Sequence, residues 1–210
     1  MRDLKELLTV ALHDNQLTCS DAQQEQLINY LELMQRWNAV FNLTSITTPR
    51  EMVYLHLIDS LLMQPYLHGT QLLDVGSGAG LPGIPLAIMM PEKHWTLLDK
   101  NNKKTRFMTQ AVAELGLKNV VVVQERSENF KPAERFDSIV SRAYGSLQMF
   151  VATCAHLLAK DGLFVAMKGK HPEEELASLS ADYMIREVIP IHIKGVETER
   201  CVILIAANPG

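Results

Sequence analysis

The sequence has few cysteines and no long apolar run, and both absences exclude whole classes of protein. Its three cysteines, Cys19, Cys154 and Cys201, lie far apart without a CxxC pair, so they suit neither a disulfide framework nor a thiolate metal site. No stretch approaches the roughly 20 consecutive apolar residues that a membrane-spanning helix needs. The charged start MRDLKELLTV lacks the form of a secretory signal. We therefore expect a cytoplasmic protein with no metal and no membrane partner.

Positive charge is not in excess either. The chain has 20 basic and 24 acidic residues, a net charge of -4, which argues against a protein that grips nucleic acid with its whole surface. Any contact with nucleic acid must be local. At 210 residues, 47% of them hydrophobic, the chain can bury a core of its own and is not a disordered segment. We expect a monomer.

Residues 1–68 have the 3.6-residue apolar period of amphipathic helices. Capping signals mark the starts of a second and a third helix, at Ser20 with Gln23 and at Thr48 with Pro49. Between these helices, Trp37 to Thr48 is predicted to be an ordered loop, because its aromatic side chains accompany a cluster of Asn, Ser and Thr. Residues 1–68 thus predict an N-terminal helical cap.

From residue 69 to residue 210, short apolar runs alternate with helical stretches, which is the pattern of a parallel sheet. The predicted strands are Gln71–Val75, Trp95–Leu98, Val120–Val123, Phe136–Val140 and Leu163–Met167. The helices predicted between them are Gly83–Met90, Asn102–Leu115 and Leu147–Ala159. Two final segments, Tyr183–Ile193 and Arg200–Ala206, predict a hairpin. The expected fold is α/β: a Rossmann-like domain with a seven-stranded, mostly parallel sheet and an antiparallel pair near one edge.

The glycine-rich stretch Leu72–Gly83 follows the first of these strands and precedes a helix. In one register it matches GxGxG from Gly76, and in another it matches the dinucleotide fingerprint GxGxxG from Gly78. The pattern alone does not choose a cofactor, and a tight turn without a ligand is the alternative. A carboxylate at Asp74 would repel a pyrophosphate but suits the ammonium and sulfonium groups of S-adenosylmethionine. We therefore expect Gly76 and Gly78 to contact S-adenosylmethionine.

Polar residues follow the next three predicted strands, at the edge of the sheet where ligands bind. Asp99 ends the second strand, 19 residues after Gly80, where a carboxylate can accept hydrogen bonds from ribose hydroxyls. Ser127 and Glu128 lie after the third strand, and Arg142 ends the fourth, facing the reacting centre. The structural alternatives are a helix cap for Asp99, a polar loop for Ser127 and Glu128, and a surface position for Arg142.

Several catalytic signatures are missing. The fourth strand ends in Ser141–Tyr144 rather than in an acidic or Asn residue followed by Pro-Pro and an aromatic, the arrangement common for exocyclic amines. Cys154 falls inside a predicted helix, where a core position is more frequent than a nucleophile, and no GxSxG elbow is present. The remaining chemistry is transfer to an atom with a free lone pair, such as guanine N7, which needs no general base. The rate would come from alignment of donor and acceptor.

Basic residues gather at two places on the same expected edge of the sheet. Lys103, Lys104 and Arg106 occupy the first turns of a predicted helix, where the helix dipole disfavours cations unless an anion compensates. Lys168 and Lys170 follow the fifth strand. Both groups are candidates for contacts with a phosphate backbone, although solvated lysines on a surface are the alternative.

The chain resembles the ribosomal small-subunit methyltransferase G family, also called the glucose-inhibited division protein B group, over nearly its whole length. The resemblance is carried by Trp37-Asn38, Asn42-Leu43-Thr44, His56-Leu57-Ile58-Asp59-Ser60, Asp74 to Pro85, Leu97-Leu98-Asp99 and Ser141-Arg142-Ala143. It implies the class I S-adenosylmethionine-dependent methyltransferase fold and formation of 7-methylguanosine in 16S ribosomal RNA near the decoding centre. The partner would be 16S rRNA or a small ribosomal subunit in assembly.

The resemblance also implies which residues bind the cofactor. These are Gly76, Leu81, Ser127, Glu128 and Arg142, with Asp99 at the ribose. Ser127 is expected to act through its backbone amide. Arg142 is expected to take the catalytic role without serving as a base. The alternatives are a small-molecule methyltransferase, an NAD-binding oxidoreductase and an RNA-binding assembly factor with a vestigial cofactor site.

Overall fold

A computed structural model describes residues 2–169 and 171–208, whose strands form one sheet in the order β3-β2-β1-β4-β5-β7-β6. The strands are β1 (Gln71–Val75), β2 (His94–Asp99), β3 (Val120–Gln124), β4 (Phe136–Arg142), β5 (Leu158–Lys168), β6 (Tyr183–Ile191) and β7 (Arg200–Ala207). Strands β1 to β5 run parallel to one another, whereas β7 runs antiparallel to both β5 and β6. The predicted seven-stranded, mostly parallel sheet with an antiparallel pair at one edge is confirmed.

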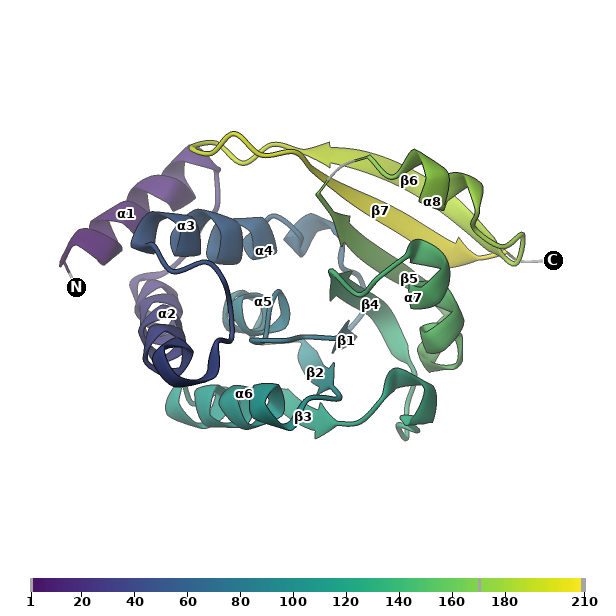
Figure 1. The fold of residues 1–210 in the computed structure, drawn as a ribbon, viewed down its shortest axis with the longest axis horizontal. Coiled ribbons are helices and arrows are strands. Elements are labelled where there is room, and N and C mark those ends of the chain that lie inside the picture. The colour runs from purple at the N-terminus through teal and green to yellow at the C-terminus, as the bar shows by residue number, and fades with distance from the viewer. Residues whose placement is uncertain (1, 170, 209–210) are drawn as a thin grey trace.

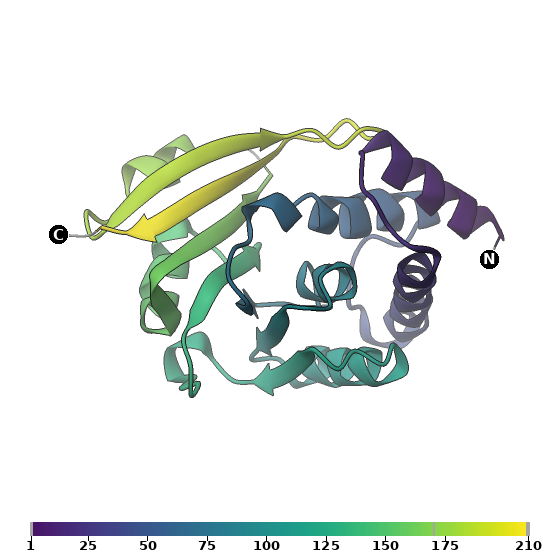
Figure 2. The same ribbon diagram turned by 180° about the vertical axis from the view of Figure 1, so that it is seen from behind.

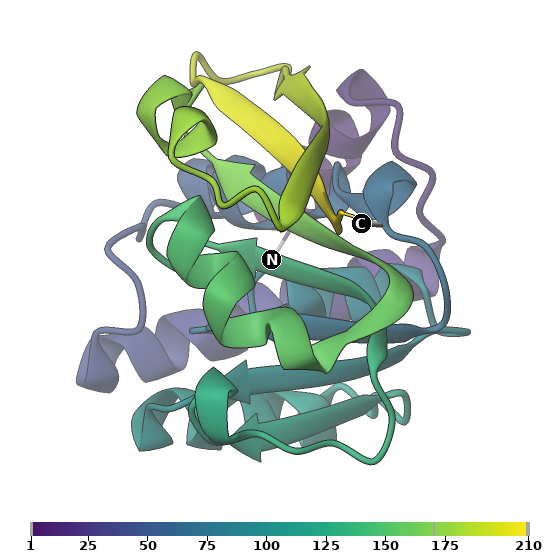
Figure 3. The ribbon, with the colours of Figure 1, turned by 90° about the vertical axis from the view of Figure 1, so that its right-hand side faces the viewer.

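Helices cover both faces of this sheet (Figures 1 and 2). One side carries α1 (Arg2–Asp14), α2 (Asp21–Phe41), α3 (Pro49–Met52), the π-helical turn η1 (Val53–Ile58), α4 (Asp59–Leu61), α5 (Gly83–Met89) and α6 (Asn102–Glu114). The other side carries α7 (Leu147–Cys154) and α8 (Glu173–Ala177), which lie nearest the viewer in Figure 3. Short 3-10 turns are η2 (Gln64–Tyr66), η3 (Ser127–Asn129) and η4 (Ala155–Leu157). Each face of the sheet buries its own apolar cluster.

The helices of residues 1–68 share a core with the sheet. One apolar cluster extends from Leu8 on α1 to Val202 on β7. The predicted caps are present: Ser20 and Gln23 form a reciprocal capping box, and the Thr48 side chain accepts a hydrogen bond from the Glu51 amide. A boundary between two domains at residue 68 remains a prediction. Among the described residues, every helix is too short or too polar to span a bilayer.

Two predicted boundaries are wrong. Helix α2 continues through Phe41 and ends at Asn42, whose left-handed conformation (φ 49°) breaks the helix, so the loop after it is shorter than predicted. The aromatic contact of Trp37 with Phe107 on α6 keeps this last stretch helical. Helix α7 ends at Cys154, and β5 begins at Leu158, which pairs with β4. In both cases contacts distant in sequence outweigh local preference.

A buried hydroxyl on α2 forms a hydrogen bond to the glycine-rich turn. Its removal tests how much this bond contributes to the free energy of unfolding. The Tyr30 hydroxyl on α2 donates to the Ala79 carbonyl at 2.5 Å. In Tyr30→Phe that buried carbonyl loses its donor, so we expect the free energy of unfolding to fall by about 1–3 kcal/mol in urea denaturation. The matched control is Tyr66→Phe, because the Tyr66 ring is half-buried and its hydroxyl has no hydrogen bond to the described residues. Equal losses in the two variants would contradict this role.

Candidate active site

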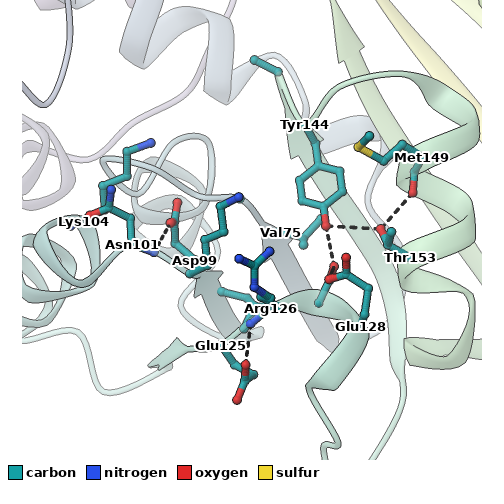
Figure 4. A pocket seen from close by; sticks show the side chains of 15 residues that line it. Val75, Asp99, Asn101, Lys104, Glu125, Arg126, Glu128, Tyr144, Met149 and Thr153 are labelled. Atoms are coloured by element: carbon teal, nitrogen blue, oxygen red, sulfur yellow. Dashed lines mark hydrogen bonds between the residues drawn. The ribbon is translucent and has the colours of Figure 1, made fainter.

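The carboxyl ends of β1, β2 and β4 surround a cavity of about 510 Å³ (Figure 4). Its walls come from the loops that follow β1, β2, β3 and β4, from the start of α6 and from α7. The lining residues are Val75, Gly76, Leu98, Asp99, Lys100, Asn101, Lys104, Glu125, Arg126, Ser127, Glu128, Ala143, Tyr144, Met149 and Thr153. Ligand sites in open α/β sheets lie at this edge, and the volume suits a small-molecule cofactor.

The glycine-rich turn is joined to the end of β2 by backbone hydrogen bonds. The Gly76 amide donates to the Leu98 carbonyl at 2.8 Å, and the Gly78 amide donates to Asp99 Oδ2 at 2.9 Å. The Asn101 amide donates to Asp99 Oδ1 at 2.8 Å. Each carboxylate oxygen can accept a second bond, so Asp99 still has capacity for donors in the cavity that it lines.

Gly76 is required by close approach as well as by backbone conformation. Its φ of +69° is in the left-handed region, and a Cβ on this residue would lie 2.8 Å from Cδ2 of the Tyr144 ring. Figure 4 shows that ring on the side of the opening across from Asp99. A side chain at position 76 would therefore fill the space between the glycine turn and β4.

Asp74 has a different role from the one predicted. Its carboxylate is fully buried, lies outside the cavity lining, and accepts a hydrogen bond at 2.9 Å from the Gly83 amide, at the first turn of α5. It therefore does not face a sulfonium directly. A Cβ on Gly83 would lie 2.8 Å from Asp74 Oδ2, so glycine allows this approach. The carboxyl takes up an amide at the start of α5, where a dinucleotide fold would turn its helix amides toward pyrophosphate, which argues against the NAD alternative.

The opposite wall of the cavity is a chain of hydroxyl groups. Ser127 is buried, and its hydroxyl donates to the Glu128 carboxylate at 3.0 Å and bonds the Tyr144 hydroxyl. Thr153 on α7 donates to the same Tyr144 oxygen at 3.2 Å. The hydrogen bond from the backbone amide of Glu128 itself, followed by the one from Ser127, lowers the pKa of Glu128. Glu128 therefore presents a carboxylate to the cavity at neutral pH.

The structure brings some of the predicted cofactor residues together and leaves others apart. Gly76, Asp99, Ser127 and Glu128 line one cavity. Gly78 supports it from behind through Asp99. Leu81 is buried, and its amide donates to the Ser77 carbonyl. Cofactor contacts by all six of these residues remain predictions, and so does a contact by Arg142, which lies outside the cavity lining.

The site residue that sequence reasoning missed is Tyr144. Its position at the carboxyl end of β4 was a usable signal, since an aromatic side chain there lies at the ligand-binding edge of the sheet. From the sequence, Tyr144 stands out only because Ser141–Tyr144 departs from the motif for exocyclic amines. That comparison does not predict that Tyr144 lines a cavity. Thr153 and Met149 are one helix away and gave no comparable signal.

Arg142 lies beside the cavity, on the side of the cap helices. Its Nη1 donates to the Leu55 carbonyl at 2.9 Å and to Asp59 Oδ2 at 3.4 Å. The π-helical turn η1 shifts the hydrogen-bond pattern by one residue, and the Leu55 carbonyl within it accepts this guanidinium. The other oxygen of Asp59 accepts from Arg200 Nε at 3.2 Å. A carboxylate 2% exposed thus holds two guanidinium groups at the carboxyl ends of β4 and β5. The catalytic role of Arg142 remains a prediction.

The predicted basic residues differ in availability. Lys104 lines the cavity, Lys103 and Arg106 are exposed, and none of the three belongs to an ion pair of the described residues. Lys168 is not a free cation, because its amine bonds Glu175 at 2.8 Å and the Gly145 carbonyl at 2.7 Å. Its charge is already compensated. Lys170 lies outside the described residues.

Two side chains that often act as bases are poorly suited to that work. Burial, together with the charge of Arg142, lowers the pKa of His56 to about 4, and its Nε2 lies 3.1 Å from the Thr44 hydroxyl rather than beside Asp59. Cys154 is fully buried in the apolar cluster under α7, which confirms its core position, and this burial raises the pKa of its thiol to about 11. In the described part of the chain, no group of three metal-ligating side chains is present.

This sheet order, with a cofactor-sized cavity over β1, β2 and β4, defines the class I methyltransferase fold. A glycopeptide N-methyltransferase, MtfA, solved with S-adenosyl-L-methionine, has a TM-score of 0.64 at 11% identity, over 74% of this chain and 88% of its own. A SAM-dependent methyltransferase from Aquifex aeolicus has a TM-score of 0.61 at 16% identity, over 78% and 96%. These likenesses establish the fold.

The sequence comparisons go further. Residues 23–203 match the family model described as rRNA small subunit methyltransferase G. The chain is 43% identical to the ribosomal RNA small subunit methyltransferase G of Escherichia coli strain SMS-3-5, over 96% of this chain and 97% of that protein. It is 44% identical to the one from Yersinia pseudotuberculosis strain YPIII, over 99% and 100%. The chain belongs to the rRNA small subunit methyltransferase G family, as its motifs predicted.

The buried carboxyl of Asp74 can be tested by the pH dependence of the free energy of unfolding. Burial raises its pKa to about 7, partly offset by the Gly83 amide, whereas an unfolded Asp titrates near pH 3.9. Between these values the native state binds more protons than the unfolded state, so stability falls as pH rises from about 4 to about 7. Asp74→Asn does not titrate and keeps an acceptor for Gly83. Relative to wild type, its free energy of unfolding should rise by a few kcal/mol across that window.

The control for this measurement is Asp161→Asn, an exposed position at the other edge of the sheet. It should follow the wild-type pH profile in urea denaturation. If the Asp74→Asn profile also runs parallel to wild type, the carboxyl at position 74 does not titrate in this range and its assigned environment is wrong.

Proposed function

We propose that this protein transfers a methyl group from S-adenosylmethionine to N7 of a guanine in 16S rRNA near the decoding centre, in the cytoplasm. The observation that carries the proposal is the identity of 43–44% over nearly the full length of curated rRNA small subunit methyltransferase G proteins. The cavity supports it, because its residues fit this cofactor.

The fit rests on shape and on chemistry. Asp99 offers carboxylate lone pairs for ribose hydroxyls, and Val75, Leu98 and Met149 give apolar surface for an adenine. Gly76 leaves room where a side chain would collide with Tyr144. When bound, this cofactor supplies an electrophilic methyl group on a sulfonium. The protein's own residues hold the cofactor in one orientation relative to the acceptor. This alignment supplies most of the rate enhancement.

Guanine N7 suits the groups around the cavity. Methylation at N7 releases no proton from that atom, so the reaction needs no general base, and neither His56 nor Cys154 lines the cavity. Arg142 places a positive charge beside the cavity, on the side of the cap helices, where we expect the guanine to enter. Its hydrogen bonds to Asp59 and to the Leu55 carbonyl fix it there. We assign it to contact with the RNA rather than to proton transfer.

An anionic acceptor agrees with the charges beside the cavity. Lys103, Lys104 and Arg106 face solvent or the cavity edge. An RNA nucleotide can therefore approach the cavity while the rest of the RNA stays on the surface.

The test incubates purified protein and methyl-labelled donor, in separate reactions, with small ribosomal subunits, with deproteinised RNA and with a metabolite extract, all from cells lacking this protein. We expect labelled 7-methylguanosine in 16S rRNA, formed faster on particles, because the net charge of -4 gives weak and salt-sensitive binding to naked RNA. Label in metabolites rather than in RNA would favour the small-molecule alternative. Equal rates on particles and naked RNA would refute the role of the particle.

Asp99 is predicted to control affinity for the cofactor. Asp99→Asn keeps the shape but removes the charge that strengthens hydrogen bonds to the ribose, so the Kd of S-adenosylhomocysteine should rise roughly 10- to 100-fold. Isothermal titration measures it, with Asp161→Asn as the matched control for an aspartate outside the cavity. An unchanged Kd would place the ribose elsewhere.

Arg142 is predicted to act on the RNA side. Arg142→Ala should lower kcat/KM for ribosomal particles roughly 10- to 100-fold, the effect of one charge-assisted hydrogen bond, while Arg142→Lys should recover part of it. Arg186→Ala, an exposed arginine on β6, is the control. Binding of S-adenosylhomocysteine separates the two assignments: a large loss of its affinity in Arg142→Ala would move this residue to the cofactor.

A further inference from the structure

The last turn of α2 exposes apolar side chains that the core does not use. Val40 is 71% exposed and Phe41 is 36% exposed. The Phe41 ring lies 4.9 Å from the Trp37 ring, which packs edge-on against Phe107 at 5.6 Å. Trp37 is thus anchored on one side by α6, while Phe41 and Val40 extend the apolar surface outward.

The last turn of α2 lies against the middle of α6. Trp37 Nε1 donates to Gln110 at 3.1 Å, and the Trp37 ring packs on Phe107. Helix α2 crosses α6 here, because both Gln26 and Arg36 bond the end of α6, at the Leu115 carbonyl and at Glu114. Figure 1 shows the two axes at a large angle. Arg106 directly precedes Phe107 in the chain, so the aromatic turn lies next to the basic start of α6.

The aromatic turn and the cations share one surface with the cavity. Trp37 and Arg106 line the same shallow hollow of about 480 Å³, together with Thr109, Gln110 and Gln124. Lys104, two residues before Arg106 and on the same turn of α6, lines the cofactor cavity. A ligand that crosses α6 can therefore contact Trp37, then Arg106, and reach the edge of the cavity.

The charges on this surface identify the class of partner. Lys103, Lys104 and Arg106 stand at the positive end of the α6 dipole, and the ion pairs of the described residues leave all three out. A second copy of a chain with net charge -4, bound through the apolar turn alone, would not compensate them. Single-stranded RNA satisfies both features, because bases stack on aromatic side chains while phosphates meet cations.

We propose that Trp37, Val40, Phe41 and Arg106 form a docking surface for unpaired nucleotides next to the target guanine; this rests on the proposed function. In paired A-form RNA the major groove that carries N7 is deep and narrow, so the target must be presented unpaired. Nucleotides beside it are then also unstacked. The surface holds them while the guanine enters the site.

The test compares Val40→Ser/Phe41→Ser with Val10→Ser, a valine 53% exposed on α1. We expect the double variant to raise KM for unmodified small subunits roughly tenfold or more, with S-adenosylhomocysteine affinity and folding unchanged. Phe41→Trp should retain wild-type KM. An unchanged KM in the double variant would overturn the docking surface while leaving the methyltransferase function intact.

Fluorescence gives a second readout that does not depend on turnover. Trp95 is 1% exposed, so quenching by a nucleic acid reports on Trp37. A mixed-sequence single-stranded oligoribonucleotide should quench the wild type and Val10→Ser, but not the double variant, and a matched duplex should quench weakly. Equal quenching by the duplex, or a dimer in sedimentation that the double variant abolishes, would overturn the assignment to unpaired RNA. If wild type binds the oligonucleotide but methylates no RNA, the proposed function fails and the surface stands.

Discussion

The site is organised by a buried carboxylate that closes a turn. Asp74 Oδ2 accepts the Gly83 amide at 2.9 Å across the seven-residue bend, residues 76–82, between β1 and α5. A buried polar group is costly unless it is hydrogen-bonded, so this bond fixes where α5 begins and how the glycine turn faces the cavity. The same bond takes up an amide at the start of α5 that a dinucleotide fold would turn toward pyrophosphate.

The cap helices belong to the site as much as the sheet does. Tyr30 on α2 bonds the Ala79 carbonyl of the glycine turn, and Asp59 on α4 joins Arg142 at the end of β4 to Arg200 at the start of β7. The cap therefore fixes Arg142 at the end of β4 and also supports the glycine turn of the cavity.

Local patterns predicted the sheet, the capping boxes, and the places of Gly76 and Asp99, because strand ends and helix starts are encoded by neighbouring residues. They failed where distant contacts decide. The extension of α2 to Phe41 depends on α6, and the neutralisation of Lys168 depends on Glu175. The sequence predicts that Asp74 lies near the end of β1. The direction of its side chain depends on the Gly83 amide, and the apolar periodicity of the sequence does not reveal that contact.

The proposed transfer of a methyl group to one guanine N7 in 16S rRNA can be tested in cells. Nucleoside mass spectrometry would compare small-subunit RNA from cells with and without the protein. The RNA of the deleted cells should lack a single 7-methylguanosine, and the wild-type chain should restore it. An unchanged content of 7-methylguanosine in those cells would contradict the proposed transfer.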